Sequence, residues 1–359
     1  MIPIEKLKQV THVYTHAHCP DGMASAMILK DAFRMLGTSP QIEFLVHGTP
    51  EHRLAGWGDG MFALFCDIAP HPEAVEGRMV GQFSGPLREM PGIVLDHHVG
   101  ARDIVEAFGE NGVYADAEKE PGVSGAVLAF REVWHPINME THTTQLGQEK
   151  VQDFALSVGA RDTWQTKDPR FMHGQYISKM LMSKPASHWL GVPFSSESNR
   201  KGGWYYLTDE EIACGRALFE SHEHAVAQAV EQCVHYTVEG HGLFVFQEQA
   251  CGFRLCSDVA EAIRGDQKLP LAPARGRVVA GFSYVVDKPG GEPKLVYSLR
   301  GLNGFDVCAL AKTNGGGGHK AAAGFSVVLD GRSATPSEAG PYEYVRRRLE
   351  AFLNGGVKQ

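Results

Sequence analysis

The sequence predicts an α/β protein in which a parallel sheet is followed, across a long helix, by a smaller C-terminal α/β unit. First, short apolar runs alternate with helix-like segments in the N-terminal part, as the crossover connections of a parallel sheet require. Second, an amphipathic segment over 208–233 with an acidic start is long enough to connect two domains. Third, alternating strands and a hairpin turn follow that segment. We therefore expect domains over 1–206 and 235–359 with a connecting helix over 207–234.

The five strands of the first sheet are predicted from apolar runs at 10–15, 42–46, 61–66, 93–95 and 112–115. Helices between and after them are predicted over 23–33, 72–80, 103–109, 121–134, 148–158 and 170–182. The segment 135–147 is expected to be irregular and 193–204 to be an exposed loop. Residues 165–206 could cap a cleft, form a homodimer contact or only elaborate the surface.

The C-terminal unit is predicted to mix strands and helices. Strands are expected at 237–238, 243–247, 277–286, 294–299 and 324–329, with a hairpin turn at 287–291. Helices are expected over 305–313 and 341–353. Such a unit is large enough to carry a binding site of its own.

Composition limits the classes of function. The chain has 359 residues, of which 43% are hydrophobic and 21% charged, as in globular proteins with a sizeable core. Its net charge of −8 argues against a broad basic face for long duplex nucleic acid. Short anionic substrates remain compatible with that charge, because a bound metal ion supplies positive charge locally.

The cysteines and the hydropathy pattern predict a reducing compartment and no membrane span. Seven cysteines without framework spacing are typical of reduced thiols, and no cysteine pair has zinc-ribbon spacing. The N-terminus carries no apolar signal core, and no apolar run approaches the length of a membrane span. We therefore expect a cytoplasmic protein with no membrane partner.

Asp96, His97 and His98 follow a buried strand at its carboxyl end, where ligands bind in open α/β sheets. Together they offer one oxygen and up to two nitrogen ligands to a divalent cation. In isolation, the same three residues could equally be a capped turn with a solvated histidine pair.

Other acidic residues also follow apolar segments. Asp67 comes directly after the strand at 61–66, where a buried carboxylate without a partner would be costly and a cation would remove that cost. Asp21 follows the first strand and could alternatively cap the next helix. Asp162 follows the apolar segment 154–158 and could alternatively form a surface ion pair with Arg161.

A run of four glycines near the C-terminus predicts a phosphate-binding loop. Glycines expose backbone N–H groups and allow an anion to approach closely. Adjacent cationic side chains, and an arginine at the end of the preceding strand, would add charge-assisted donors. The predicted substrate-binding residues are Arg300, Gly316, Gly317, Gly318, His319 and Lys320. The alternative is a flexible hairpin tip.

Taken together, these motifs resemble the DHH phosphoesterase superfamily with its DHH-associated C-terminal domain. The four motifs of the first domain are matched, in order, by residues 16–22, 67–70, 96–98 and 162. The substrate-binding signature of the second domain is matched by residues 298–300 and 315–319. The resemblance covers almost the whole chain and implies that 1–206 is a DHH metal-binding catalytic domain.

The resemblance implies a role for each matched residue. Asp21, Asp67, His97 and Asp162 would hold a pair of divalent cations, commonly Mn²⁺ with Mg²⁺ or Co²⁺ as alternatives, and Asp67 would bridge them. His98 would face the scissile phosphate, while Asp96 would anchor the loop and could also ligate. Carboxylates and imidazoles suit Mn²⁺, and two hard cations about 4 Å apart can activate a water for attack on phosphorus.

The sequence departs from the family pattern in its first motif. Many members carry a second aspartate where this chain has Met23, and a thioether will not replace a hard oxygen ligand. The family histidine falls at Ala17, which is flanked by His16 and His18. We expect His16 to be the ligand because it follows the strand directly, with His18 as the alternative.

The function that the resemblance implies is Mn²⁺-dependent hydrolysis of short single-stranded oligonucleotides, as in nanoRNases. The alternatives are a phosphodiesterase of cyclic dinucleotides and a phosphatase of 3′-phosphoadenosine 5′-phosphate. A rival of another class is a nucleotide-binding sensor without activity, which the loss of a ligand at Met23 would produce. A processive exonuclease would need stacking platforms along a basic groove, against which the acidic balance argues.

Overall fold

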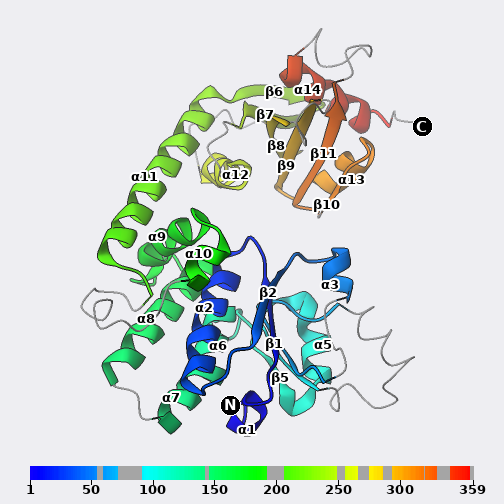
Figure 1. Ribbon diagram of the computed structural model, residues 1–359. Coiled ribbons are helices and arrows are strands. Elements are labelled where there is room, and N and C mark those ends of the chain that lie inside the picture. The colour runs from blue at the N-terminus through cyan, green and yellow to red at the C-terminus, as the bar shows by residue number, and fades with distance from the viewer. Residues whose placement is uncertain are drawn as a thin grey trace. The chain divides into compact units, whose positions relative to one another are not determined.

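The computed structural model describes residues 1–54, 60–71, 91–141, 145–191, 206–248, 255–265, 275–285, 293–318, 320–329 and 340–355 (Figure 1). The chain divides into two compact units, Met1–Phe219 and Glu220–Gln359. The division falls within the long helix α11 (Asp209–Gln232), which corresponds to the helix predicted over 208–233.

The first unit contains a five-stranded parallel sheet in the order β2-β1-β3-β4-β5. Its strands are β1 (His12–His16), β2 (Gln41–Leu45), β3 (Ala63–Cys66), β4 (Gly92–Asp96) and β5 (Gly112–Tyr114). All five were predicted, and the α/β fold class is confirmed. Because the strands are parallel, the residues that follow them gather at one edge of the sheet.

Helices cover both faces of this sheet. They are α1 (Ile4–Leu7), α2 (Pro20–Met35), α3 (Pro50–Leu54), α5 (Arg102–Ala107), α6 (Gly125–Ala129), α7 (His135–Thr141), α8 (Gln145–Asp162), α9 (Phe171–Met182) and α10 (Ala186–Gly191). In Figure 1, α2, α6 and α8 lie on one side of the sheet and α5 lies on the other. Leu64 and Cys66 of β3 join the core on the first side, whereas Phe65 packs with Val105 of α5 on the second. Burial on both faces explains why these strands are continuous apolar runs.

Two sequence predictions on the helices are wrong. The segment predicted to be irregular is helical over its described residues, because α7 continues directly from a π-helix at Phe130–Trp134 and α8 begins at Gln145. Ile137 of α7 is fully buried in the core, so tertiary packing overrides the polar local composition. Helix α8 is longer than the predicted 148–158 and ends at Asp162. The predicted helix 72–80 and loop 193–204 lie outside the described residues.

The second unit contains a six-stranded sheet in the order β10-β11-β9-β8-β7-β6. Its strands are β6 (Val234–Val238), β7 (His241–Gln247), β8 (Arg275–Val285), β9 (Lys294–Leu302), β10 (Gly317–Gly318) and β11 (Ala322–Val328). Strands β7 and β8 are parallel, and the other neighbouring strands are antiparallel. The hairpin turn predicted at 287–291 lies outside the described residues.

The helices of the second unit pack on opposite faces of its sheet. Helices α13 (Val307–Lys312) and α14 (Gly340–Leu353) share a core with Leu295, Tyr297 and Leu299 of β9. Helix α12 (Cys256–Gly265), which was not predicted, packs on the other face (Figure 1). Because side chains alternate along a strand, Ser298 and Arg300 of β9 lie on the α12 face. Within the described residues, no helix is both long and apolar enough to cross a membrane.

Candidate functional site

The residues predicted to bind metal lie at the carboxyl edge of the five-stranded sheet. His16 is the last residue of β1, Asp67 follows β3, and Asp96 ends β4 with His97 directly after it. Asp21 lies in the first turn of α2, and Asp162 is the last residue of α8. The fold therefore gathers residues that are far apart in the sequence.

His97 lies at the centre of the acidic side chains. Its Nε2 is 3.2 Å from Asp67 Oδ1, 3.7 Å from Asp21 Oδ2 and 3.6 Å from Asp162 Oδ2. The His97 side chain is only 8% exposed. One imidazole cannot neutralise this many buried carboxylates, so the cluster carries uncompensated negative charge when it is ionised.

Asp21 is held by the N-terminus of α6. Its Oδ1 accepts hydrogen bonds from Ser124 Oγ at 2.7 Å and from the Ala126 backbone N–H at 2.9 Å. Its Oδ2 accepts from the Gly125 N–H at 2.6 Å. These donors fix the orientation of the carboxylate. This contact was not predicted from the sequence, although Ser124 before an apolar run is a helix-capping signal.

Asp67 is the most strongly perturbed acid of the cluster. It is 1% exposed, and its Oδ2 has no hydrogen-bond partner among the described residues. Burial, and then the charge of Asp21, raise the pKa of Asp67 well above its usual value. A Cβ atom on Gly125 would lie 2.4 Å from the Asp67 Cβ, so only glycine permits this close approach. A divalent cation would satisfy the orphaned oxygen and reverse the unfavourable charge.

Asp162 closes the cluster from α8. Burial, followed by the charge of Asp21, raises the pKa of Asp162 to about 6. The helix predicted from the sequence ended at residue 158, whereas Asp162 is the last residue of α8. Its distance to His97 shows that it belongs to the cluster and not only to a surface pair with Arg161.

Asp96 does not lie in the acidic cluster but orients the loop that carries the two histidines. Its Oδ1 accepts from the backbone N–H groups of His97 at 2.7 Å and His98 at 3.0 Å. The same oxygen lies 2.7 Å from His98 Nδ1. This hydrogen bond outweighs burial and raises the pKa of His98. Because Nδ1 is engaged and His98 is 49% exposed, its Nε2 is the nitrogen available to a ligand.

The first motif contributes His16 and an unexpected thiol. His16 Nδ1 lies 3.9 Å from Asp67 Oδ2, whereas His18 belongs to no candidate metal group among the described residues. Met23 is 8% exposed and packs into the apolar core. Cys19, the residue before α2, has its sulfur in a group with His16 and Asp67. Burial, and then the charges of Asp21 and Asp162, raise the pKa of Cys19 to about 11.

The described residues form three overlapping groups whose ligand atoms lie within 4.8 Å of one another. The groups are His16 with Cys19 and Asp67, Asp67 with His97 and His98, and Asp21 with His97 and Asp162. These residues fit divalent cations, since the donors are carboxylate, imidazole and thiol atoms around an orphaned buried oxygen.

The glycine loop of the second unit connects α13 to β11. Its first glycine, Gly315, has a positive φ of 73°, and its Gly316 would bring a Cβ to 2.1 Å from Gly324 O. Gly318 has a φ of 137° and would bring a Cβ to 2.5 Å from Ala323 Cα. Three of the four glycines therefore also have a conformational or steric reason within the chain itself, and their role in anion binding stays a prediction. Gly315 and Gly317 both have no described atom within 4 Å of the Cβ position, and of these two only Gly317 also lacks a positive φ.

Arg300 lies near the end of this loop in the same sheet. It pairs in register with Ala322, the first residue of β11. Its Nε donates to Ser257 Oγ at 2.9 Å, at the start of α12. Lys320 is exposed, and His319 lies outside the described residues. The structure therefore brings Arg300 and the glycine loop together within the second unit.

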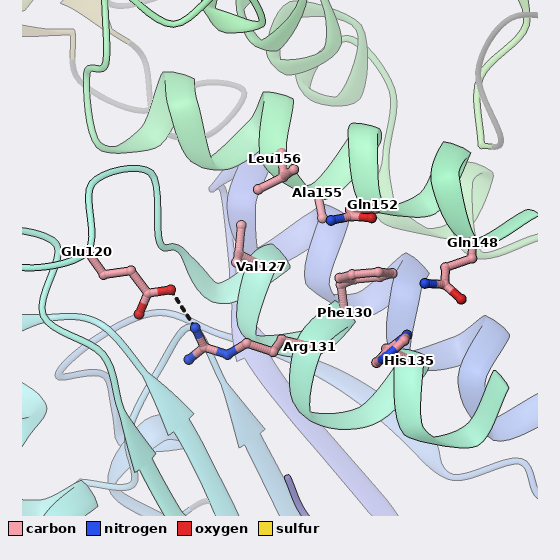
Figure 2. Close-up of a pocket in the computed structure, with 9 residues that line it drawn as sticks. All are labelled: Glu120, Val127, Phe130, Arg131, His135, Gln148, Gln152, Ala155 and Leu156. Carbon is pink, nitrogen blue, oxygen red and sulfur yellow. Dashed lines mark hydrogen bonds and ion pairs between the residues drawn. The ribbon is translucent and has the colours of Figure 1, made fainter. Parts of the chain in front are cut away.

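A separate cavity of about 390 Å³ lies between α6, the π-helix and α8 (Figure 2). Val127, Phe130 and Leu156 form apolar walls, and Arg131 Nη1 donates to Glu120 Oε1 at 2.5 Å at one end. None of the predicted site residues is among the residues that line this cavity.

Comparison with known proteins identifies the fold. No family model matches the sequence, and no curated protein sequence matches it. The manganese-bound exonuclease RecJ is 13% identical with a TM-score of 0.54, and the match covers 99% of this chain and 93% of that one. The DHH domain of a member of a family of ribosomal proteins is 11% identical with a TM-score of 0.53, covering 98% and 88%.

CDC45 from Entamoeba histolytica is 9% identical with a TM-score of 0.52, and the match covers 96% of this chain and 95% of that one. At these identities the likeness concerns the fold. The chain has the fold of DHH-domain proteins, as its motifs predicted.

Proposed function

We propose that the chain is a divalent-metal-dependent phosphoesterase that hydrolyses short oligonucleotides, as nanoRNases do. The observation that carries this proposal is the convergence of Asp21, Asp67 and Asp162 on His97 at the carboxyl edge of the parallel sheet. The orphaned Asp67 Oδ2 indicates that this edge is built for a cation. The likeness in fold to an exonuclease whose structure holds manganese supports the same reaction class.

Asp21, Asp67, His97 and Asp162 would hold a pair of cations, Mn²⁺ in the first place and Mg²⁺ or Co²⁺ as alternatives. Bound cations would supply Lewis acidity, which activates water and stabilises the negative oxygens of phosphoryl transfer. His98 would contact the substrate through Nε2, because Asp96 holds its Nδ1. Asp96 is thus a positioning residue, and the α6 N-terminus positions Asp21 in the same way.

The second unit would bind a substrate phosphate away from the reacting bond. Gly317 leaves its backbone open to an anion, and Arg300 of β9 and Lys320 of the loop before β11 supply positive charge. His319 and the neighbouring Gly316 and Gly318 would complete this loop. Remote phosphate binding orients a short substrate and favours capture of molecules with a defined number of phosphates. Cyclic dinucleotides and 3′-phosphoadenosine 5′-phosphate are the alternative substrates.

One observation favours a second candidate, a nucleotide-binding sensor without activity. Met23 packs into the apolar core and supplies no oxygen ligand at the position where many family members have an aspartate. A chain that binds one cation weakly would retain substrate binding and lose turnover.

A turnover screen separates the two candidates. The full chain, stripped with EDTA and supplied with Mn²⁺, is incubated with oligonucleotides of two to ten residues, cyclic dinucleotides and 3′-phosphoadenosine 5′-phosphate. We expect hydrolysis that is fastest for the shortest oligonucleotides and absent in EDTA. Binding of the same substrates without product in excess Mn²⁺ would contradict the enzyme and favour the sensor. Arg300→Ala should raise KM with little change in kcat if Arg300 holds a remote phosphate.

A further inference from the structure

The two ends of the metal cluster differ in the chemistry of their donors. At one end, Asp21 and Asp162 present oxygen atoms to His97, which is a set of hard and borderline ligands. At the other end, His16, Cys19 and Asp67 present one nitrogen, one sulfur and one oxygen atom within 4.8 Å of one another. A sulfur donor changes which cation a site prefers.

The backbone explains why Cys19 reaches this position. His16 ends β1 and Cys19 is the residue before the first turn of α2, so both lie on the short connection that crosses the edge of the sheet. A Cβ atom on Gly22 would lie 2.2 Å from His16 O, so the start of α2 packs closely against the end of β1. This close packing keeps Cys19 beside His16.

A second observation indicates that this end binds a ligand. Asp67 Oδ2, the oxygen nearer to His16, is buried and lacks a hydrogen-bond partner among the described residues. Asp67 is 1% exposed, so water does not readily satisfy it. An orphaned carboxylate oxygen beside an imidazole and a thiol is an arrangement that a cation completes.

The neighbouring residues single out Cys19 as the soft donor. Met23 lies in the core and offers no hard oxygen to this end of the cluster. Cys66, another thiol nearby, is fully buried, and its Sγ lies 3.4 Å from Gly125 O. Cys19 is half-buried and is the thiol that the candidate groups contain within the described residues.

We propose that Cys19 is a metal ligand, and that His16, Cys19 and Asp67 form a mixed nitrogen, sulfur and oxygen site that selects Zn²⁺ or Co²⁺ over Mn²⁺ and Mg²⁺. The site at Asp21, His97 and Asp162 keeps a preference for hard cations, so the two positions take different metals. The inference rests on the proposed function in one respect, namely that this edge of the sheet binds divalent cations. On binding, the Cys19 thiol releases its proton to solvent and the thiolate coordinates the metal.

Cobalt spectroscopy tests the proposal without relying on turnover. The full chain, stripped with EDTA under reducing conditions, is titrated with CoCl₂ while the near-ultraviolet absorbance is recorded. We expect a thiolate-to-cobalt charge-transfer band in the wild type and in Cys214→Ser, which removes an exposed thiol on α11. Cys19→Ser should lose the band. Equilibrium dialysis should show Zn²⁺ affinity falling about tenfold or more in Cys19→Ser, with Mn²⁺ affinity little changed.

A second variant and a labelling measurement cover the case in which Cys19→Ser folds poorly. Cys19→Asp should abolish the cobalt band and raise Mn²⁺ affinity, because it restores a hard oxygen to this end of the cluster. In the wild type, Zn²⁺ should slow alkylation of Cys19, measured by peptide mass spectrometry, and leave alkylation of Cys214 unchanged.

Two outcomes would overturn the proposal: bound cobalt without a charge-transfer band in the wild type, or a band that persists in Cys19→Ser. Hydrolysis in Mn²⁺ together with either outcome would leave the proposed function intact and reject the mixed site. A Cys19-dependent band in a chain that hydrolyses none of the substrates would reject the proposed function alone.

Discussion

The edge of the five-stranded sheet and the glycine loop of the second unit were both predicted as binding elements, and the structure gives them different physical characters. At the sheet edge, charged side chains are buried and contact one another, with His97 Nε2 3.2 Å from Asp67 Oδ1. At the glycine loop, the cationic Lys320 is exposed and most of the glycines are required by backbone geometry. The sheet edge holds several acidic side chains close together in a buried site. In the glycine loop, by contrast, the glycines mainly allow close approach of backbone segments.

This difference shows how strongly each motif constrains its interpretation. Asp67 is buried and its Oδ2 has no hydrogen-bond partner in the described part of the chain, an arrangement that a bound cation would complete. A glycine at a positive φ or in close contact has a sufficient explanation within the fold itself. Gly317, which has neither constraint, is the glycine whose role in binding can be tested separately from folding.

The largest expected effect is that of Asp67→Asn. Asp67 has a φ of 63°, a conformation that asparagine tolerates well, so the backbone should be retained. Loss of a carboxylate from the cation site should lower kcat about a thousandfold or more, since metal sites contribute several kcal/mol to transition-state stabilisation. In EDTA, the free energy of unfolding should rise by roughly 1–2 kcal/mol, because a neutral amide replaces a buried carboxyl group whose Oδ2 has no partner among the described residues.

Rates of Mn²⁺-dependent hydrolysis and urea unfolding in EDTA check these two effects. The matched control is Asp153→Asn, which alters an exposed carboxylate on the same unit and should change neither quantity. If Asp67→Asn were less stable than the wild type in EDTA, the Asp67 carboxyl group would be well solvated or well paired, which contradicts an unfavourable environment at the sheet edge.

Much of this edge could be predicted because the end of each strand is marked by the local sequence pattern. Apolar runs locate the ends of β1, β3 and β4, and parallel pairing then places His16, Asp67 and His97 at one edge. The family resemblance supplied Asp162, which comes from α8 and not from a strand end. Its packing against His97 depends on where α8 lies, which the local pattern does not determine.

Other features could not be predicted because they depend on contacts between distant segments. Ser124 bonds Asp21 across more than a hundred residues, and a capping signal alone does not name its partner. The sequence does not distinguish Cys19 from the other thiols, because its sulfur lies near Asp67 only in the folded chain. Helix α12 was not predicted, although its Ser257 accepts a hydrogen bond from Arg300 and so helps to orient that side chain.

An intermediate effect is expected in the pH dependence of stability of the metal-free chain. The native pKa of Asp162 is about 6, against an ordinary value of 3.8. An acid with a raised native pKa stays protonated to a higher pH in the folded state than in the unfolded state. The free energy of unfolding therefore falls as pH rises between about 4 and 6. In Asp162→Asn the substituted amide does not titrate. The advantage of this variant over the wild type in EDTA should therefore grow across that window to roughly 3 kcal/mol.

Urea unfolding at a series of pH values in EDTA measures this difference. Asp168→Asn is the control of opposite sign, because its hydrogen bond to Arg170 lowers the pKa of Asp168 and stabilises the fold above the unfolded pKa. That variant should be less stable than the wild type at neutral pH, with the deficit vanishing in acid. If the stability difference between Asp162→Asn and the wild type did not change with pH, the acidic cluster would not be electrostatically strained. With Mn²⁺ present, the wild type should instead become the more stable of the two, because the bound cation stabilises it.

The smallest effect is expected at the glycine loop and separates folding from binding there. Gly316→Ala places a Cβ 2.1 Å from Gly324 O, so β10 and β11 must shift, and the second unit should lose roughly 1–3 kcal/mol of stability. Gly317→Ala meets no described atom within 4 Å and should leave the unfolding midpoint unchanged. If an anion approaches the open backbone at Gly317, the added methyl group should raise KM about tenfold with kcat nearly constant. Steady-state kinetics on the best short oligonucleotide, alongside thermal unfolding of both variants, decides the matter: an unchanged KM in Gly317→Ala would make the loop a structural hairpin and leave phosphate binding to Arg300.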